Sequence, residues 1–310
     1  MNNPEGNQYA PNSQIAVLNT DPIEVTKNIV VRDCKISYFQ ENGVLLRRTQ
    51  DCRVTNCEVS DATDIGGGGA GYGILVCGNG FESFSMVGSN MDCRYNFIDN
   101  NTLKGPYLRH AIILSYVAHN NLIYNNTIDG CQDEPLDLHG EDEFLNVFTK
   151  NKVSNVAKTA IGLGNPGSTH DATGPGNVIY GNVVENSNGG IQVSYGTPDT
   201  QIYNNEFNNL KEGSTAINIS YGPATTIRNN KINTISGTSV GISVYYSYVW
   251  NDPSLGLYTV DIQSNTIQKV NTAMYFEAYR TGTKIKNNVF TDCTNGIVSV
   301  SYTHLTLPTT

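Results

Sequence analysis

The chain has 310 residues and a formal net charge of −9, with 19 Lys and Arg against 28 Asp and Glu. This acidic balance argues against general nucleic-acid binding. The sequence also contains no apolar run of membrane-spanning length, and its seven cysteines follow no zinc-ligand spacing.

The two ends of the chain carry little information about the fold. The N-terminal residues 1–6 are polar and contain no apolar region of the kind that a signal peptide has. Residues 300–310, including His304, resemble the translation of a sequencing-library adapter. We therefore expect this tail to be an artefact and both natural ends to be missing.

Two short phrases alternate along the rest of the sequence. The first phrase has four positions, as in Asn100–Leu103. A polar residue comes first, Asn or Cys second, any residue third and an apolar residue fourth. The second phrase is Gly or Ala, apolar, any residue, apolar, as in Ala111–Leu114. A period of about 23 to 25 residues with occasional insertions indicates a solenoid. Short β-branched strands without a sustained helical period predict an all-β chain.

This pattern resembles the right-handed parallel β-helix family, which are solenoids of stacked β-coils. The resemblance covers residues 28–299 as a parallel β-helix of about ten coils. Residues 1–27 are expected to be a polar segment or an incomplete first coil, and residues 300–310 the artefact tail.

Equivalent residues of successive coils lie about 4.8 Å apart and should form ladders. The asparagines of the first phrase predict such a ladder at a corner, because Asn tolerates the left-handed conformation of a tight turn. Cys34 and Cys57 would cap it as small buried residues. The predicted ladder is Asn101, Asn126, Asn151, Asn182, Asn205, Asn230, Asn265 and Asn288.

The acidic stretch Asp133–Glu143 contains the strongest candidate site. Leu136–His139 alternates apolar and polar residues, so Asp137 and His139 should share the outer face of a strand. Aligning the second phrase places Gly162 and Gly164 beside them on the next coil, where missing side chains leave room for a ligand.

Insertions in the neighbouring coils should bring further polar residues to this face. One insertion carries His170 and Asp171 one coil later, and another carries Arg109 and His110 one coil earlier. Loops on a rigid scaffold commonly carry function. Aromatic residues that suit sugar rings are also expected on the outer surface. These are Tyr116, Tyr195, Tyr221, Tyr246 and Trp250.

β-Helices with a carbohydrate groove resemble two groups of enzymes, and polysaccharide lyases are the first expectation. There, Arg109 would clamp a uronate carboxylate, and His139, His110 or His170 would remove the adjacent proton by β-elimination. Clustered carboxylates would bind Ca²⁺. The expected ligands are Glu141, Asp142, Glu143 and Asp171, together with Asp137. Lys104 and Lys158 are expected in turns and not on the outward strand positions.

Two alternatives stay open. A glycoside hydrolase would use Asp137 with Glu141 or Asp171 as acid and base, tuned by His139. A non-catalytic glycan-binding adhesin or fibre shaft would carry Glu141–Glu143 as a solvated turn. In each case the partner is a polysaccharide or oligosaccharide, with no nucleic acid and no membrane span, and the protein is expected to be secreted or displayed on the cell surface.

Overall fold

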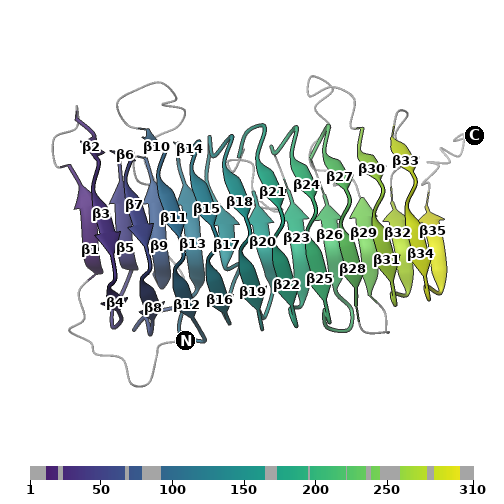
Figure 1. Cartoon of the computed structure of the whole chain (residues 1–310), viewed down its shortest axis with the longest axis horizontal. Helices are drawn as coiled ribbons and strands as arrows, with labels where there is room; N and C mark the ends of the chain where they lie inside the picture. Colours follow the sequence, from purple (N-terminus) through teal and green to yellow (C-terminus); the bar gives the residue numbers. More distant parts are fainter. Residues whose placement is uncertain are drawn as a thin grey trace, which may run out of the picture.

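The computed structural model describes residues 12–19, 24–66, 70–78, 92–164, 173–194, 196–220, 222–234, 239–244, 259–277 and 283–300. All regular elements of these residues are β-strands, stacked along one long axis (Figure 1). Every strand pairs in parallel with its equivalent in a neighbouring coil, so the predicted parallel β-helix is confirmed. The described residues form no helix that is long and apolar enough to cross a membrane.

Three long sheets form the walls of the solenoid, and each coil passes through them in the same order. We call them sheets A, C and D, with a short sheet B between A and C in the early coils. Sheet A contains β1 (Ser13–Leu18), β5 (Asn42–Arg47), β9 (Tyr72–Cys77), β13 (His110–Ser115), β17 (Leu136–Leu138), β20 (Thr159–Leu163), β23 (Gly189–Val193), β26 (Thr215–Ile219), β29 (Val240–Val244), β32 (Thr272–Phe276) and β35 (Asn295–Ser299).

The other sheets consist of shorter strands. Sheet B contains β2 (Thr26–Lys27), β6 (Thr49–Gln50), β10 (Cys93–Arg94) and β14 (Ala118–His119). Sheet C contains β3 (Val30–Arg32), β7 (Arg53–Thr55), β11 (Phe97–Asp99), β15 (Leu122–Tyr124), β18 (Val147–Thr149), β21 (Val178–Tyr180), β24 (Gln201–Tyr203), β27 (Thr226–Arg228), β30 (Asp261–Gln263) and β33 (Lys284–Lys286). Sheet D contains β4 (Lys35–Ile36), β8 (Glu58–Ser60), β12 (Thr102–Lys104), β16 (Thr127–Asp129), β19 (Lys152–Ser154), β22 (Val183–Glu185), β25 (Glu206–Asn208), β28 (Lys231–Asn233), β31 (Thr266–Gln268) and β34 (Val289–Thr291).

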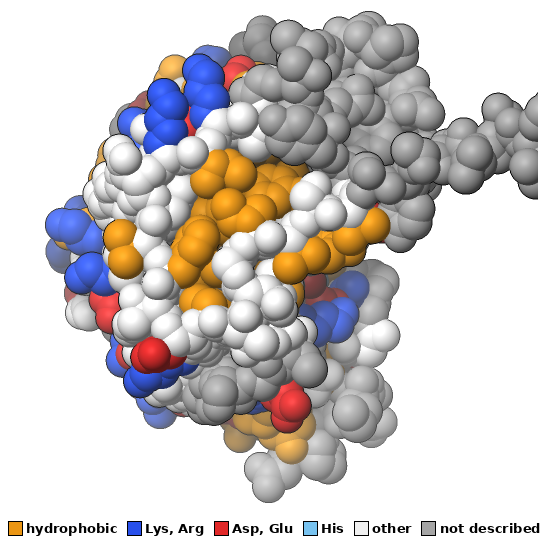
Figure 2. Space-filling model, turned by 90° about the vertical axis from the view of Figure 1, so that its right-hand side faces the viewer, with side chains coloured by type: hydrophobic (Ala, Val, Ile, Leu, Met, Phe, Trp, Pro, Cys, Tyr) orange, Lys and Arg blue, Asp and Glu red, His pale blue; other side chains and the backbone are white. Residues whose placement is uncertain are grey.

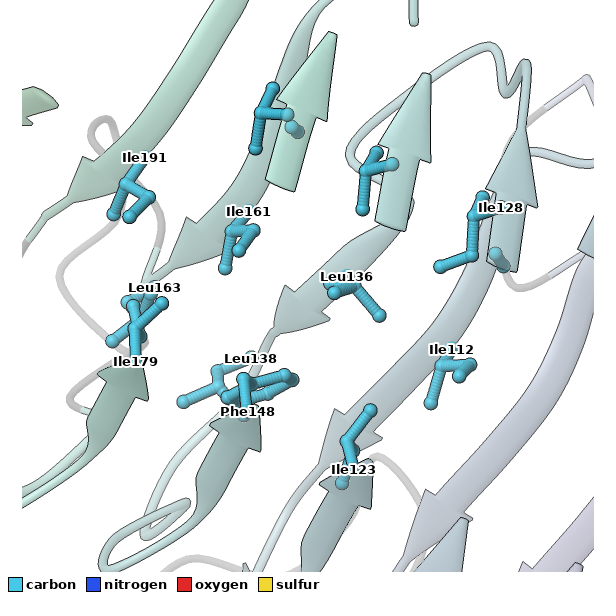
Figure 3. Packing of buried hydrophobic residues seen from close by; sticks show 14 of the residues in the cluster. Ile112, Ile123, Ile128, Leu136, Leu138, Phe148, Ile161, Leu163, Ile179 and Ile191 are labelled. Atoms are coloured by element: carbon cyan, nitrogen blue, oxygen red, sulfur yellow. The ribbon is translucent and has the colours of Figure 1, made fainter. Parts of the chain in front are cut away.

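The core is a continuous column of apolar side chains inside these walls. Ile112, Leu136, Ile161 and Ile191 stack on successive strands of sheet A and are at most 1% exposed (Figure 3). An end-on view shows apolar side chains gathered in the middle and charged side chains at the rim (Figure 2). Burial of these stacked side chains is the main force that holds the coils together.

The predicted asparagine ladder is present. The side-chain Nδ2 of Asn101 donates to Oδ1 of Asn126 at 3.0 Å, and Asn126 donates to Asn151 at the same distance. The backbone N–H of Cys57 donates to Oδ1 of Asn101 at 3.0 Å, so Cys57 caps the ladder as expected. A second ladder was not predicted and runs through Asn96, Asn121, Asn146 and Asn177.

The structural reason given for the ladder needs a correction. The left-handed conformation belongs to the residue before each ladder asparagine, for example Asn100 with φ 56° and Asn125 with φ 54°. The ladder residues themselves are buried, except for the half-buried Asn288, and their amides donate to backbone carbonyls of sheet C strands, such as those of Val54 and Ile98. Corner geometry and ladder bonding are therefore divided between two adjacent positions.

The predicted outward positions of sheet A are also correct. The register pairs Ile113 with Asp137, Asp137 with Gly162, and Gly162 with Gln192. β1 lies within residues 1–27, where an incomplete first coil was expected, and it already pairs with β5 of the next coil. Because the register holds coil by coil, residues far apart in sequence are fixed side by side on the outer face of sheet A.

Candidate active site

Three charged residues stack in the turns that lead into β13, β17 and β20. The backbone N–H of Asp133 donates to the carbonyl of Arg109 at 2.9 Å, which fixes these turns on adjacent coils. Asp133 Oδ2 lies 3.6 Å from Arg109 Nε, and Asp133 Oδ1 accepts a 2.6 Å hydrogen bond from Lys158 Nζ. One carboxylate is thus held between two cations from the coils on either side.

His110 begins β13 and lies behind this column, 4% exposed. Its Nδ1 is 2.7 Å from the backbone carbonyl oxygen of Glu134, and its ring meets Tyr72 edge-on with centroids 5.4 Å apart. Burial lowers the pKa of His110 to about 4. A carbonyl only accepts hydrogen bonds, so the neutral ring carries its proton on Nδ1.

Asp137 occupies the middle of β17 and is 4% exposed. Its Oδ2 lies 3.5 Å from Nδ1 of His110 and 3.7 Å from Nδ1 of His139. The next coil has Gly162 at the matching position. A Cβ at Gly162 would lie 2.9 Å from Asp137 Oδ1 and 3.0 Å from Glu134 Cγ, so the two acidic side chains flank the same small space.

Asp133 and Glu134 have opposite protonation behaviour. Burial, helped by a hydrogen bond to Asp133 and by the negative charge of Asp133, raises the pKa of Glu134 to about 7. Burial alone would raise the pKa of Asp133 as well. The hydrogen bonds from Glu134 and Lys158 outweigh burial and hold the pKa of Asp133 well below its usual range. Below about pH 7 the pair therefore holds one proton, on Glu134, beside an ionised partner.

These groups line one open cavity of about 280 Å³ on the outer face of sheet A. The cavity floor includes Gly162 and Gly164, as the sequence predicted. The lining residues are Arg109, His110, Asp133, Glu134, Asp137, His139, Lys158, Gly162, Gly164 and Gln192. A proton donor, two ionisable carboxylates, two cations and a 39% exposed imidazole on His139 thus surround a space that a ligand can enter.

Four of the predicted site residues come together here: Arg109, His110, Asp137 and His139. Sequence reasoning missed Asp133, Glu134 and Lys158 as site residues. Lys158 was expected in a turn, and it does lie in one, but that turn opens onto the cavity. A usable signal was present, since Arg109, Asp133 and Lys158 each stand three residues before the paired inward residues Ile112, Leu136 and Ile161.

The other described candidates lie at the far end of the strand. Tyr116 follows β13 with φ 42° and does not line the cavity, and Glu141–Glu143 do not line it either. Glu143 is fully buried, and burial raises the pKa of Asp142 although the charge of His119 opposes this. His119 stacks on Phe144 with centroids 4.4 Å apart.

The remaining candidates cannot be placed on the fold. His170, Asp171, Tyr195, Tyr221, Tyr246 and Trp250 lie outside the described residues. Within the described ranges, no three His, Cys, Asp or Glu side chains are grouped as ligands of a metal ion. The calcium assignment to Glu141, Asp142, Glu143 and Asp171 therefore stays a prediction.

Comparison with known proteins identifies the repeats and their fold. The family model described as "Right handed beta helix region" matches residues 23–207 and 147–307. A comparison with curated proteins finds no significant match.

Several solved structures have a similar fold. An alginate lyase from Paenibacillus sp. str. FPU-7 is 14% identical with a TM-score of 0.54, covering 86% of this chain and 99% of its own. An endo-xylogalacturonan hydrolase from Aspergillus tubingensis is 11% identical with a TM-score of 0.54, covering 88% of each chain. A mutant tailspike protein of E. coli bacteriophage HK620, in complex with a pentasaccharide, is 10% identical with a TM-score of 0.51, covering 93% of this chain and 56% of its own. At these identities the similarity shows the fold alone.

Proposed function

This chain belongs to the right-handed β-helix family, and we propose that it is a carbohydrate-active enzyme that hydrolyses glycosidic bonds with Glu134 as general acid. The observation that carries this proposal is the cavity in which the side chains of Glu134 and Asp137 flank the open space above Gly162, while burial and the neighbouring Asp133 raise the pKa of Glu134. Pairs of carboxyl groups with separated pKa values are the usual acid–base machinery of glycoside hydrolysis.

In this proposal each residue of the cavity has a definite role. Glu134 donates its proton to the glycosidic oxygen as the bond to the leaving sugar breaks. Asp137 is the second carboxylate, which activates water or stabilises the positive charge that develops on the sugar ring. His110 and His139 lie on either side of Asp137, within 3.7 Å of its Oδ2.

Asp133 has a supporting role, because its ionised carboxylate keeps the shared proton on Glu134. Lys158 and Arg109 compensate the charge of Asp133 from the two neighbouring coils. The carbohydrate class of the substrate is supported by solved structures of the same fold, among them an alginate lyase, a xylogalacturonan hydrolase and a tailspike bound to a pentasaccharide.

A second candidate function is β-elimination by a polysaccharide lyase, and a specific observation favours it. Arg109 and Lys158 both reach the cavity, where they could neutralise a uronate carboxylate, and the partly exposed His139 could remove the adjacent proton. Against it stands Asp133, which already occupies both cations. Asp137 and ionised Asp133 would also repel an anionic sugar.

The two reactions leave different products. Hydrolysis of a glycan panel produces reducing ends without ultraviolet absorbance, whereas elimination produces an unsaturated uronic end that absorbs. A binding protein produces neither. Replacement of Asp137 or His139 by Ala should abolish turnover while the fold remains intact. Wild-type turnover in both variants would remove this cavity from consideration.

Two further parts of the proposal are tested separately. If Glu141, Asp142, Glu143 and Asp171 hold Ca²⁺, a chelator should lower thermal stability or activity, and added Ca²⁺ should restore it. If the protein acts outside the cell, fractionation of its natural host should find it in the medium or at the cell surface.

A further inference from the structure

The outer face of sheet A changes character at the cavity. On the coils before the cavity, the outward side chains Leu45, Leu75 and Ile113 form a buried apolar cluster with Tyr72 and Cys77. On the coils after it, the same column continues as residues of a different kind. These are Gly162, Gln192, Asn218, Ser243 and Tyr275.

The strands after the cavity carry no charge on sheet A. The sequences of β20, β23, β26, β29 and β32 are TAIGL, GGIQV, TAINI, VGISV and TAMYF. The same coils place charged residues on the other sheets, for example Glu185 and Lys231 on sheet D and Arg228 on sheet C. The lack of charge is therefore particular to these five strands, although Glu277 directly follows β32.

The side chains on this face can exchange hydrogen bonds with hydroxyl groups. Gln192 lines the cavity, and its Nε2 donates to Ser194 Oγ at 3.2 Å. Asn218, one coil further, is half-buried, and its Oδ1 has no hydrogen-bond partner among the described residues. Amides and hydroxyls both donate and accept, as sugar hydroxyls do. This oxygen is itself shielded from solvent, so a bound hydroxyl would satisfy it once the Asn218 side chain turns toward the ligand.

We propose that Gln192, Asn218, Ser243 and Tyr275 form a track for an uncharged glycan, which runs along the solenoid axis from the cavity toward β32. Successive coils rise by about 4.8 Å, so the track offers one side chain to each successive part of an extended chain. Among the described residues of this row, a polyuronate would find no cationic partner for its carboxylates, which carries a desolvation cost. An uncharged glycan meets no such cost.

The apolar cluster gives the track a direction. Leu45, Leu75 and Ile113 are at most 9% exposed and offer no polar atom of a side chain to a sugar. Tyr72 of this cluster contacts His110 at the edge of the cavity. The glycan therefore extends mainly to one side of Glu134, over the later coils. This inference rests on the proposed function for its cleavage site but makes its own claim about substrate class.

Binding to the full chain carrying Glu134→Gln tests the track without turnover. The probes are neutral gluco- and xylo-oligosaccharides and acidic oligogalacturonates and oligomannuronates, each of two to six units, measured by calorimetry. We expect at least one neutral series to bind more tightly with each added unit up to the length of the track. Acidic oligomers of equal length should bind at least about tenfold more weakly.

Single substitutions locate the binding. Loss of one hydrogen bond of about 1 kcal/mol corresponds to about a fivefold loss of affinity, so Asn218→Ala and Gln192→Ala should each lose about that much. Gln268→Ala is the matched control, since Gln268 is equally half-buried but lies on β31 of sheet D, and its affinity should not change.

The outcomes separate the track from the hydrolytic proposal. Tighter binding of an acidic series, failure of every neutral series to bind, or unchanged affinity in Asn218→Ala would overturn the track. Neutral binding along the track without hydrolysis by the wild-type protein would leave the track standing and end the hydrolytic assignment. Hydrolysis of a polyuronate by the wild-type protein would leave the hydrolytic assignment standing and overturn the uncharged substrate class.

Discussion

The imidazole Nδ1 of His110 lies 2.7 Å from the backbone carbonyl oxygen of Glu134, one coil further along the solenoid. His110 is the proton donor in this bond, because the carbonyl can only accept. The bond fixes the backbone of the residue to which we assign the acid role. A buried, neutral histidine can therefore contribute to the site by positioning Glu134.

Protonation of His110 should destabilise the fold. Its pKa is about 4 in the folded protein, against 6.5 for a histidine exposed to water, so the unfolded chain binds the proton more tightly between these values. Stability from this group should fall as pH decreases from 6.5 to 4, by on the order of 3 kcal/mol. Denaturant unfolding of His110→Asn, which keeps a donor near Nδ1, should show a flatter pH dependence than wild type in this window. An equally steep dependence in both proteins would contradict the assignment.

Glu134→Gln should reduce turnover by about 10²- to 10⁴-fold, because the amide has no acidic proton to donate. In the wild-type enzyme, activity should decline as pH rises through about 7, where Glu134 loses its proton. Steady-state kinetics across pH measure both effects. Glu206→Gln is the control, since Glu206 lies on β25 of sheet D, away from the cavity lining. Full activity in Glu134→Gln would end the acid assignment.

Lys158→Met should move the acidic limb of the pH–rate profile to higher pH. The 2.6 Å hydrogen bond from Lys158 helps to keep Asp133 ionised, and without it the pKa of Asp133 rises toward its ordinary value. Lys152→Met removes a comparable pair, with Glu185 at 3.0 Å on sheet D, and should leave the profile unchanged. Identical profiles for wild type and Lys158→Met would show that Asp133 does not depend on this lysine.

Gly162→Ala should impair catalysis more than folding. The added Cβ would lie 2.9 Å from Asp137 Oδ1 and 3.0 Å from Glu134 Cγ, so one of the two carboxyl groups must move. Displacement of about 1 Å at a catalytic group can cost about 10²-fold in rate. Gly296→Ala is the control, since its Cβ would meet Phe290 only at an ordinary 3.7 Å. Activity and thermal unfolding should be measured together, and a purely thermal effect would argue against this geometry.

Asn126→Ala should destabilise the whole solenoid. The Asn126 side chain donates to the carbonyl of Ile98 and to Asn151 Oδ1, and it accepts from Asn101. Removal leaves several buried groups without partners, with an expected loss on the order of 3 to 5 kcal/mol. Thr127→Ala, at the exposed neighbouring position, should change stability by about 0.5 kcal/mol or less. Chemical denaturation of both variants gives the comparison, and similar values would contradict the ladder's role.

The fold was largely readable from sequence because the ladder requires an asparagine at one position of nearly every coil. The asparagine marks the same position in each coil and so gives the register between coils. The outward pairs Ile113 with Asp137 and Asp137 with Gly162 could therefore be predicted residue by residue. The left-handed corner was placed one residue too late. Asparagine occupies both positions in Asn100–Asn101, and the structure distinguishes them by backbone angle, burial and ladder hydrogen bonds.

The site was predicted where it follows strand alternation and where an insertion carried Arg109 and His110. Asp137 and His139 follow a strand alternation, which a sequence displays directly. Asp133 and Lys158 lie in turns three residues before aligned inward residues, but that spacing alone does not show that these turns open onto the cavity. The raised pKa of Glu134 depends on burial and on its contact with Asp133, and neither is visible in the order of residues.

The uniform stacking of coils has a consequence for how such proteins can be altered. Each coil bonds to its neighbours through the same ladder, so a complete coil inserted between β23 and β26 would extend the row after Gln192 by one place. The acid at Glu134 and its neighbours on β13, β17 and β20 would keep their mutual positions. The length of ligand that the protein contacts and the reaction that it performs can thus be changed independently, because they depend on different coils.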